Sequence, residues 1–125
     1  MSRPRILVID DEKIVQISCR KCLTPEGYEV DVAGNGADGL RLTREKHYDL
    51  ILTDLKMPDM DGMEFLMTMK GMQPEARVIM ITGYSTLEHA EEATRLGAYN
   101  YIEKPFTPDT LSAAVKEALR DKKKP

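Results

Sequence analysis

The strongest constraint on the fold is an alternation of short apolar segments with amphipathic segments, which repeats five times along the chain. Three apolar segments are unbroken runs rich in β-branched residues, as in strands buried on both faces of a parallel sheet: 5–9, 49–53 and 77–81. Two weaker segments, 28–33 and 98–103, alternate apolar with polar residues, which predicts edge strands. Five such βα units predict an α/β domain with a parallel sheet and helices on both faces.

The segments between the strands carry signals of helix ends. The predicted helices start near Glu12, Gly36, Asp61, Ser85 and Thr107. Asp61 and Ser85 are each followed three residues later by glutamate, which is the spacing of a capping box. Thr107 is followed by proline at the first helical position, and Gly97 stands where the preceding helix should end.

Length and charge limit the classes of function. The chain has 125 residues, which is the size of one domain, and we place that domain at residues 4–121 with a basic tail or linker start at 122–125. The net charge of −3 argues against a surface that binds nucleic acid directly. Every apolar run falls well short of the ~20 residues that cross a bilayer, so we expect no membrane contact and a cytoplasmic location with both cysteines reduced.

Polar side chains follow the predicted buried strands. Asp10 and Asp11 follow the first strand, Asp54 the third, Thr82 the fourth and Lys104 the fifth. Because parallel strands end at the same edge of a sheet, and ligands bind outside that edge, we expect these side chains to lie close together.

The charges of this cluster indicate what it binds. Two carboxylates ~4 Å apart repel by roughly 4 kcal/mol at an effective dielectric constant of 20, so three of them require cations. Lys104 supplies one positive charge, and Mg²⁺ fits the remainder because it accepts carboxylate oxygens and keeps water for a phosphate to displace. Asp54 stands alone at its strand end and is the best candidate for a nucleophile that forms an aspartyl phosphate, whereas Asp10 and Asp11 are placed to hold the metal.

The segments around these residues resemble the receiver domain of bacterial two-component response regulators, and the resemblance covers nearly the whole chain. The matching segments read ILVIDDE at 6–12, DLILTDLKMPDMDG at 49–62, IMITG at 79–83 and YIEKPF at 101–106. The resemblance implies a flavodoxin-like (βα)5 fold, doubly wound, with strand order 2-1-3-4-5.

The same resemblance implies roles for the acidic residues. Asp54 is expected to accept a phosphoryl group from the phosphohistidine of a sensor histidine kinase. Asp11 and Asp54 are expected to bind Mg²⁺ directly, together with the backbone carbonyl of Lys56, while Asp10 acts mainly through water. Lys56 and Tyr84 follow Asp54 and Thr82 by two positions, so we expect them to tune the lifetime of the phosphoryl group.

The resemblance also implies a switch. Thr82 and Lys104 are expected to hold the phosphoryl oxygens, and Thr82 acts with Tyr101 to alter the surface of the fourth helix, fifth strand and fifth helix. The implied partners are the kinase and a downstream effector domain or target protein, with a dimer that forms on phosphorylation as a further expectation. Such a domain phosphorylates and dephosphorylates itself at Asp54, so whether it is called an enzyme is a matter of definition.

The sequence also offers other interpretations. A protein-interaction module of the same fold would need no phosphoryl chemistry and would leave the clustered groups unexplained. Gly34, Gly36 and Gly39 spell G-x-G-x-x-G, as in a dinucleotide site, but they follow a predicted edge strand. Cys19 and Cys22 spell C-x-x-C well inside the first predicted helix, where packing is expected rather than redox or zinc chemistry.

Overall fold

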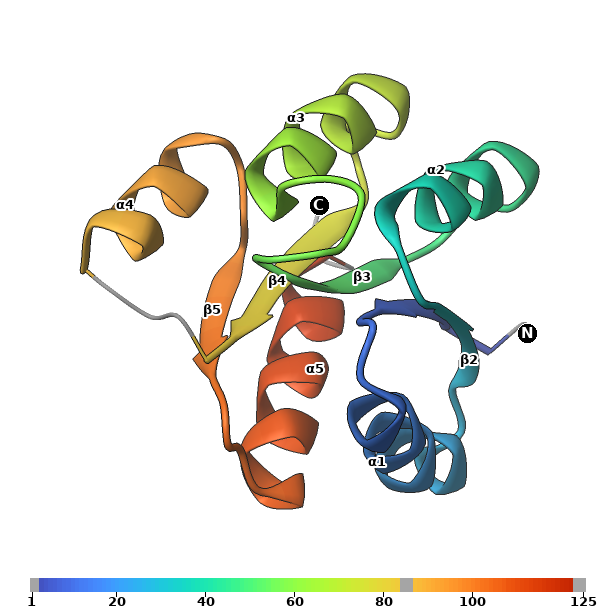
Figure 1. Cartoon of the computed structure of the whole chain (residues 1–125). Coiled ribbons are helices and arrows are strands. Elements are labelled where there is room, and N and C mark those ends of the chain that lie inside the picture. Colours follow the sequence, from blue (N-terminus) through green and yellow to red (C-terminus); the bar gives the residue numbers. More distant parts are fainter. Residues whose placement is uncertain (1–2, 84–86, 123–125) are drawn as a thin grey trace.

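The computed structural model describes residues 3–83 and 87–122, which form one parallel sheet flanked by helices (Figure 1). The strands are β1 (Arg5–Ile9), β2 (Glu29–Ala33), β3 (Leu50–Asp54), β4 (Arg77–Thr82) and β5 (Asn100–Glu103). Their order is β2-β1-β3-β4-β5, so the predicted fold class and strand order are confirmed and the two predicted edge strands lie at the edges.

Five α-helices cover the sheet on both faces. They are α1 (Lys13–Leu23), α2 (Gly36–Glu45), α3 (Gly62–Met72), α4 (Leu87–Arg95) and α5 (Pro108–Lys122). Figure 1 shows α1 and α5 on one face and α2, α3 and α4 on the other. Among the described helices, none is both long and apolar enough to span a membrane.

Side-chain caps explain where several helices begin. Asp61 accepts a hydrogen bond from the N–H of Met63 at 2.8 Å, and Thr107 accepts one from the N–H of Thr110 at 3.1 Å. These caps confirm two of the predicted helix starts. The predicted capping box at Ser85 lies outside the described residues, as do residues 123–125 of the predicted tail.

Alternate residues of each central strand enter two separate cores, as expected for a sheet covered on both faces. Leu7, Ile9 and Ile51 face α2, α3 and α4, whereas Val8 and Leu52 face α1 and α5.

Cys19 is fully buried in the core under α1 and α5, where burial raises the pKa of its thiol to about 12. Cys19 and Cys22 are both free thiols, and the burial of Cys19 agrees with a packing role.

The observed strand boundaries differ from the predicted ones by one or two residues. β2 and β3 each begin one residue later than predicted. β3 and β4 each end one residue later, because Asp54 pairs with Ile81 and Thr82 pairs with Glu103 in the sheet. β5 begins two residues later than predicted. Gly97 adopts φ +106° and the N–H of Ala98 bonds back to the carbonyl of Ala93 at 2.9 Å, so the chain is still turning there.

Candidate functional site

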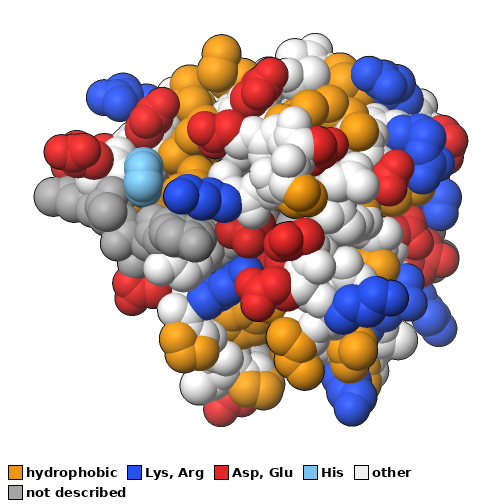
Figure 2. All heavy atoms as spheres, viewed as in Figure 1, with side chains coloured by type: hydrophobic (Ala, Val, Ile, Leu, Met, Phe, Trp, Pro, Cys, Tyr) orange, Lys and Arg blue, Asp and Glu red, His pale blue; other side chains and the backbone are white. Residues whose placement is uncertain are grey.

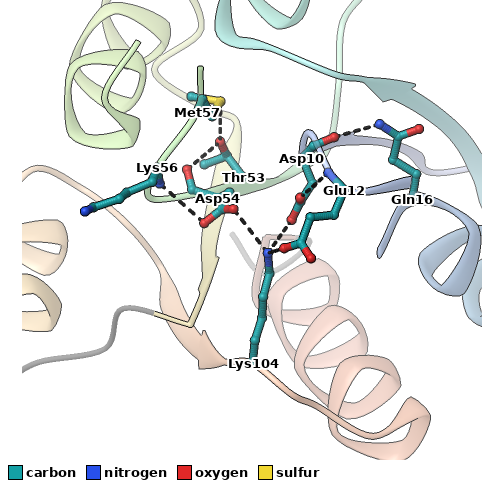
Figure 3. Close-up of polar contacts among 8 residues, drawn as sticks. All are labelled: Asp10, Glu12, Gln16, Thr53, Asp54, Lys56, Met57 and Lys104. Atoms are coloured by element: carbon teal, nitrogen blue, oxygen red, sulfur yellow. Dashed lines mark hydrogen bonds and ion pairs between the residues drawn. The ribbon is translucent and has the colours of Figure 1, made fainter. Parts of the chain in front are cut away.

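A lysine and three acidic residues meet at the carboxyl edge of the sheet (Figure 3). Lys104 follows β5, and its Nζ lies 2.8 Å from Oδ2 of Asp10, 2.9 Å from Oε1 of Glu12 and 3.1 Å from Oδ2 of Asp54. The side chain of Lys104 is only 14% exposed. One largely buried ammonium group therefore faces three carboxylates, and Figure 2 shows acidic side chains gathered near the middle of this face of the molecule.

Asp10 is the most deeply buried of the three acids. Its Oδ1 accepts a hydrogen bond from the N–H of Glu12 at 2.9 Å, and its backbone carbonyl accepts one from Nε2 of Gln16 at 2.7 Å. Its Oδ2 has no well-aligned hydrogen bond among the described residues, and the contact with Lys104 is an ion pair by distance. Burial raises the pKa of Asp10, although the contact with the Lys104 ammonium group and the hydrogen bond from the N–H of Glu12 act in the opposite direction.

The charges around Lys104 keep it protonated. Burial by itself would lower the pKa of Lys104, but its contacts with the carboxylates of Asp10, Glu12 and Asp54 outweigh it and raise the pKa above its ordinary value. Lys104 is therefore a fixed positive charge at the site.

Asp54 ends β3 and is buried, with a side chain 8% exposed. Its Oδ1 accepts a hydrogen bond from the backbone N–H of Lys56 at 3.3 Å, and its Oδ2 accepts one from Lys104 at 3.1 Å. Figure 3 shows the side chain of Lys56 extending away from Asp54, so it is the backbone of Lys56 that contacts the carboxylate.

The residues at this edge fit a divalent cation. Asp10, Glu12 and Asp54 each offer one carboxylate oxygen within 4.8 Å of the others. An all-oxygen donor set of this kind is what Mg²⁺ prefers, and the buried Oδ2 of Asp10 has an ion-pair contact with Lys104 but no well-aligned hydrogen bond among the described residues. A bound cation would offset the repulsion that Lys104 alone leaves among the three acids.

The structure brings together most of the predicted site and adds one residue. Asp10, Asp54 and Lys104 meet as expected, whereas Asp11 is exposed and lies outside the cluster of acids. Glu12 takes its place in that cluster, although sequence reasoning assigned it no role. The signal was present, since Glu12 continues the same acidic run and stands directly before α1.

Thr82 and Tyr101 lie on the neighbouring strands β4 and β5. Thr82 is fully buried at the end of β4, and its carbonyl accepts the backbone N–H of Lys104 at 2.8 Å. Tyr101 pairs with Met80 and packs, partly buried, against the core under α2, α3 and α4, where burial raises the pKa of its hydroxyl. Tyr84, which we expect to tune the phosphoryl lifetime, lies outside the described residues.

The glycine motif does not have the surroundings of a dinucleotide site. It follows β2, which is an edge strand, and the N–H groups of Gly36 and Ala37 at the start of α2 donate to the carboxylate of Asp59. A pyrophosphate would need those N–H groups and would meet the negative charge of Asp59.

Comparison with known proteins gives one consistent result. Residues 6–116 match the family model described as "Response regulator receiver domain". Sporulation initiation phosphotransferase F from Bacillus subtilis is 37% identical over 119 residues, which cover 95% of this chain and 96% of that protein. The crystal structure of a CheY-like receiver domain protein from Methanospirillum hungatei JF-1 has a TM-score of 0.93 and 37% sequence identity, with 97% of each chain covered.

Other relatives are much longer than this chain. Regulatory protein AtoC from Escherichia coli is 39% identical over 116 residues, which cover 93% of this chain but 25% of that protein. The chain thus spans about a quarter of the length of AtoC and of several other curated relatives.

Proposed function

The chain belongs to the response regulator receiver domains and acts in phosphorelay signalling, and on this premise we propose that it accepts a phosphoryl group on Asp54 from the phosphohistidine of a sensor kinase. The observation that carries the proposal is the contact of one buried ammonium group, that of Lys104, with Asp54 and two further carboxylates. Such a site has a carboxylate nucleophile and the positive charge that phosphoryl transfer requires.

In the proposed reaction, a carboxylate oxygen of Asp54 attacks the phosphorus atom of the phosphohistidine. A P–O bond forms to Asp54, the P–N bond breaks, and the imidazole nitrogen leaves with the bonding electron pair. Lys104 and Thr82 hold the phosphoryl oxygens, because an ammonium group and a hydroxyl group at this edge can both donate to them. Hydrolysis of the aspartyl phosphate by water then resets the domain.

Magnesium is the cofactor that we propose. The metal, when bound, neutralises the charge that develops on the phosphoryl oxygens during transfer. Asp54 and the backbone carbonyl of Lys56 would hold it directly, together with Asp11 once its exposed side chain turns toward Asp54, and Asp10 would act mainly through water. Glu12 lies close enough to Asp10 and Asp54 to contribute an oxygen as well.

Phosphorylation is proposed to switch a surface. The phosphoryl group adds negative charge and acceptor oxygens beside Asp54, and Thr82 shifts toward it to donate a hydrogen bond. The space that Thr82 leaves lets Tyr101 turn inward, since β4 and β5 are neighbouring strands. A partner that binds one arrangement of the α4-β5-α5 surface better than the other then reads the signal.

We propose a sensor histidine kinase and a downstream effector domain or target protein as partners, with association of two phosphorylated copies as a further outcome of the switch. The domain that carries these functions spans residues 4–121. We propose the cytoplasm as its location, where the free thiols of Cys19 and Cys22 remain reduced.

The test is phosphorylation by acetyl phosphate with and without Mg²⁺, followed by intact-protein mass spectrometry. The wild-type chain should gain one phosphoryl group only when Mg²⁺ is present, and Asp54→Asn should gain none. Asp38→Asn serves as the matched control, because Asp38 is an exposed acid on α2. Undiminished phosphorylation of Asp54→Asn would refute the assignment of Asp54.

A further inference from the structure

The first turn of α2 holds a carboxylate from a distant segment. The N–H of Gly36 donates to Oδ1 of Asp59 at 2.9 Å, and the N–H of Ala37 donates to Oδ2 of the same residue at 2.9 Å. These two hydrogen bonds lower the pKa of Asp59 below its ordinary value. The glycine motif thus binds an anion at a helix N-terminus, and that anion belongs to the chain itself.

Asp59 lies in the loop that joins β3 to α3, and this loop is also fixed at its base. The carbonyl of Leu55 accepts the N–H of Gly62 at 2.7 Å, and Lys56 forms an isolated antiparallel bridge with Asp61. The two ends of the loop are therefore held together, and Asp59 attaches its middle to α2.

Gly36 allows the loop to approach α2 closely. A Cβ atom at Gly36 would lie 2.9 Å from Sδ and 3.0 Å from Cβ of Met60, which is closer than carbon and sulfur atoms pack. Packing against Met60, next to Asp59, thus explains the second glycine of the G-x-G-x-x-G motif.

We propose that Asp59 is a positioning residue for the magnesium site, acting through the β3–α3 loop and the backbone carbonyl of Lys56. This inference rests on the proposed function, in which that carbonyl is a metal ligand. With Asp59 bonded to α2, the loop is already ordered before the metal binds. Metal binding then loses no free energy to ordering the loop. Without those bonds, the middle of the loop loses its attachment, and part of the binding free energy goes into ordering it.

The experiment measures Mg²⁺ binding by calorimetry in the wild type, Asp59→Ala, Asp59→Asn and a control, Glu64→Gln. Asp59→Asn keeps the size of the side chain but removes its charge and one acceptor oxygen, so it tests the idea even if Asp59→Ala folds poorly. Glu64 is an exposed acid that lines the same surface hollow as Asp59, so its substitution removes an equal charge nearby without touching α2.

We expect Asp59→Ala to raise the dissociation constant for Mg²⁺ about tenfold, as loss of a residue that orients metal ligands does. Asp59→Asn should raise it less, and Glu64→Gln should leave it nearly unchanged. At saturating Mg²⁺, the rate of phosphorylation by acetyl phosphate should return close to the wild-type rate in both Asp59 variants. This result would show that the substitutions weaken metal binding and do not slow the phosphoryl-transfer step. The amide ¹⁵N and ¹H resonances of Gly36 and Ala37 should shift in both.

Two outcomes overturn the positioning role alone. One is wild-type Mg²⁺ affinity in both Asp59 variants. The other is an equal loss of affinity in Glu64→Gln, which would mean that any lost negative charge nearby weakens Mg²⁺ binding by the same amount. In either case the proposed function stands, provided that the wild type binds Mg²⁺ and is phosphorylated. Failure of the wild type to do so would instead overturn the proposed function, and the positioning role with it.

Discussion

The ammonium group of Lys104 lies 3.1 Å from Oδ2 of Asp54, although 50 residues separate the two along the chain. The contact joins the ends of β3 and β5 across β4, which lies between them in the sheet. It depends on the strand order, on the parallel direction of all three strands and on where each strand ends. The site is thus a consequence of the whole fold.

Lys104 is the first target, because it pairs with three carboxylates at once. Lys104→Met should lower the free energy of unfolding in metal-free buffer by about 3 kcal/mol, since it leaves buried carboxylates without their cation. Added Mg²⁺ should stabilise the variant more than it stabilises the wild type, because the metal then replaces the missing charge. Urea unfolding with EDTA and with Mg²⁺ measures both effects.

Lys21→Met is the control for this substitution, since Lys21 is an exposed residue of α1. It should change the unfolding midpoint very little in either buffer. Equal stabilisation of Lys104→Met and wild type by Mg²⁺ would contradict the idea that ammonium group and metal serve the same carboxylates.

Two glycines of α3 provide a matched pair. A Cβ atom at Gly62 would lie 2.5 Å from the carbonyl oxygen of Asp54 and 2.7 Å from Cα of Leu55, and backbone atoms cannot move aside cheaply. Gly62→Ala should therefore cost about 2 kcal/mol or more of stability. Gly71 has open space around the same position, so Gly71→Ala should be neutral or stabilise the chain by about 0.5 kcal/mol.

Thermal unfolding of the two alanine variants gives the comparison directly. We expect a large difference in Tm between them, with Gly62→Ala the lower. Similar Tm values would mean that the loop after Asp54 is not packed against α3 as tightly as the structure has it.

Sequence reasoning reached the fold because the strongest signals were local. The bounds of β1 follow from a continuous apolar run, and the edge positions of β2 and β5 follow from their alternating patterns. The start of β5 was wrong, because the turn at Gly97 carries the chain two residues further before it pairs with β4. The ends of β3 and β4 depend on register between strands, which a single segment does not reveal.

The site was predictable only to the level of strand ends. Asp10, Asp54 and Lys104 could be placed together, because parallel strands end at one edge. Which of the acids at 10–12 join the cluster depends on the direction of their side chains, which the sequence does not reveal. Glu12 contacts Lys104, whereas the exposed Asp11 lies outside the acidic cluster. Asp59 was missed because its contact with α2 crosses between segments 22 to 23 residues apart. The roles of Thr82 and Tyr101 stay predictions.

Asp31 gives a prediction about pH away from the acidic cluster. Burial by itself would raise its pKa, but hydrogen bonds from Tyr48 at 2.7 Å and Lys46 at 3.1 Å outweigh it and lower the pKa below the ordinary value of 3.8. The stabilisation from Asp31 is therefore complete above pH 3.8 and is lost as the pH falls through the folded-state pKa.

Tyr48→Phe should raise the pKa of Asp31 and lower the stability at pH 7 by about 1.5 kcal/mol, since a hydrogen bond to a charged group is lost. The stability difference should shrink as the pH falls below 3.8, where Asp31 becomes protonated. Carboxyl ¹³C titration and urea unfolding measure the two effects. Tyr28→Phe is the control, because the Tyr28 hydroxyl has no hydrogen bond among the described residues; an unchanged Asp31 pKa in Tyr48→Phe would contradict the prediction.

The central claim is that Asp54 carries the phosphoryl group, and chemical trapping tests it most directly. Borohydride reduces an aspartyl phosphate to homoserine, so treatment of the protein after reaction with acetyl phosphate and Mg²⁺ marks the modified residue. Peptide mass spectrometry should find homoserine at position 54 and aspartate unchanged at positions 10 and 11. Homoserine at another aspartate, with position 54 intact, would contradict the account.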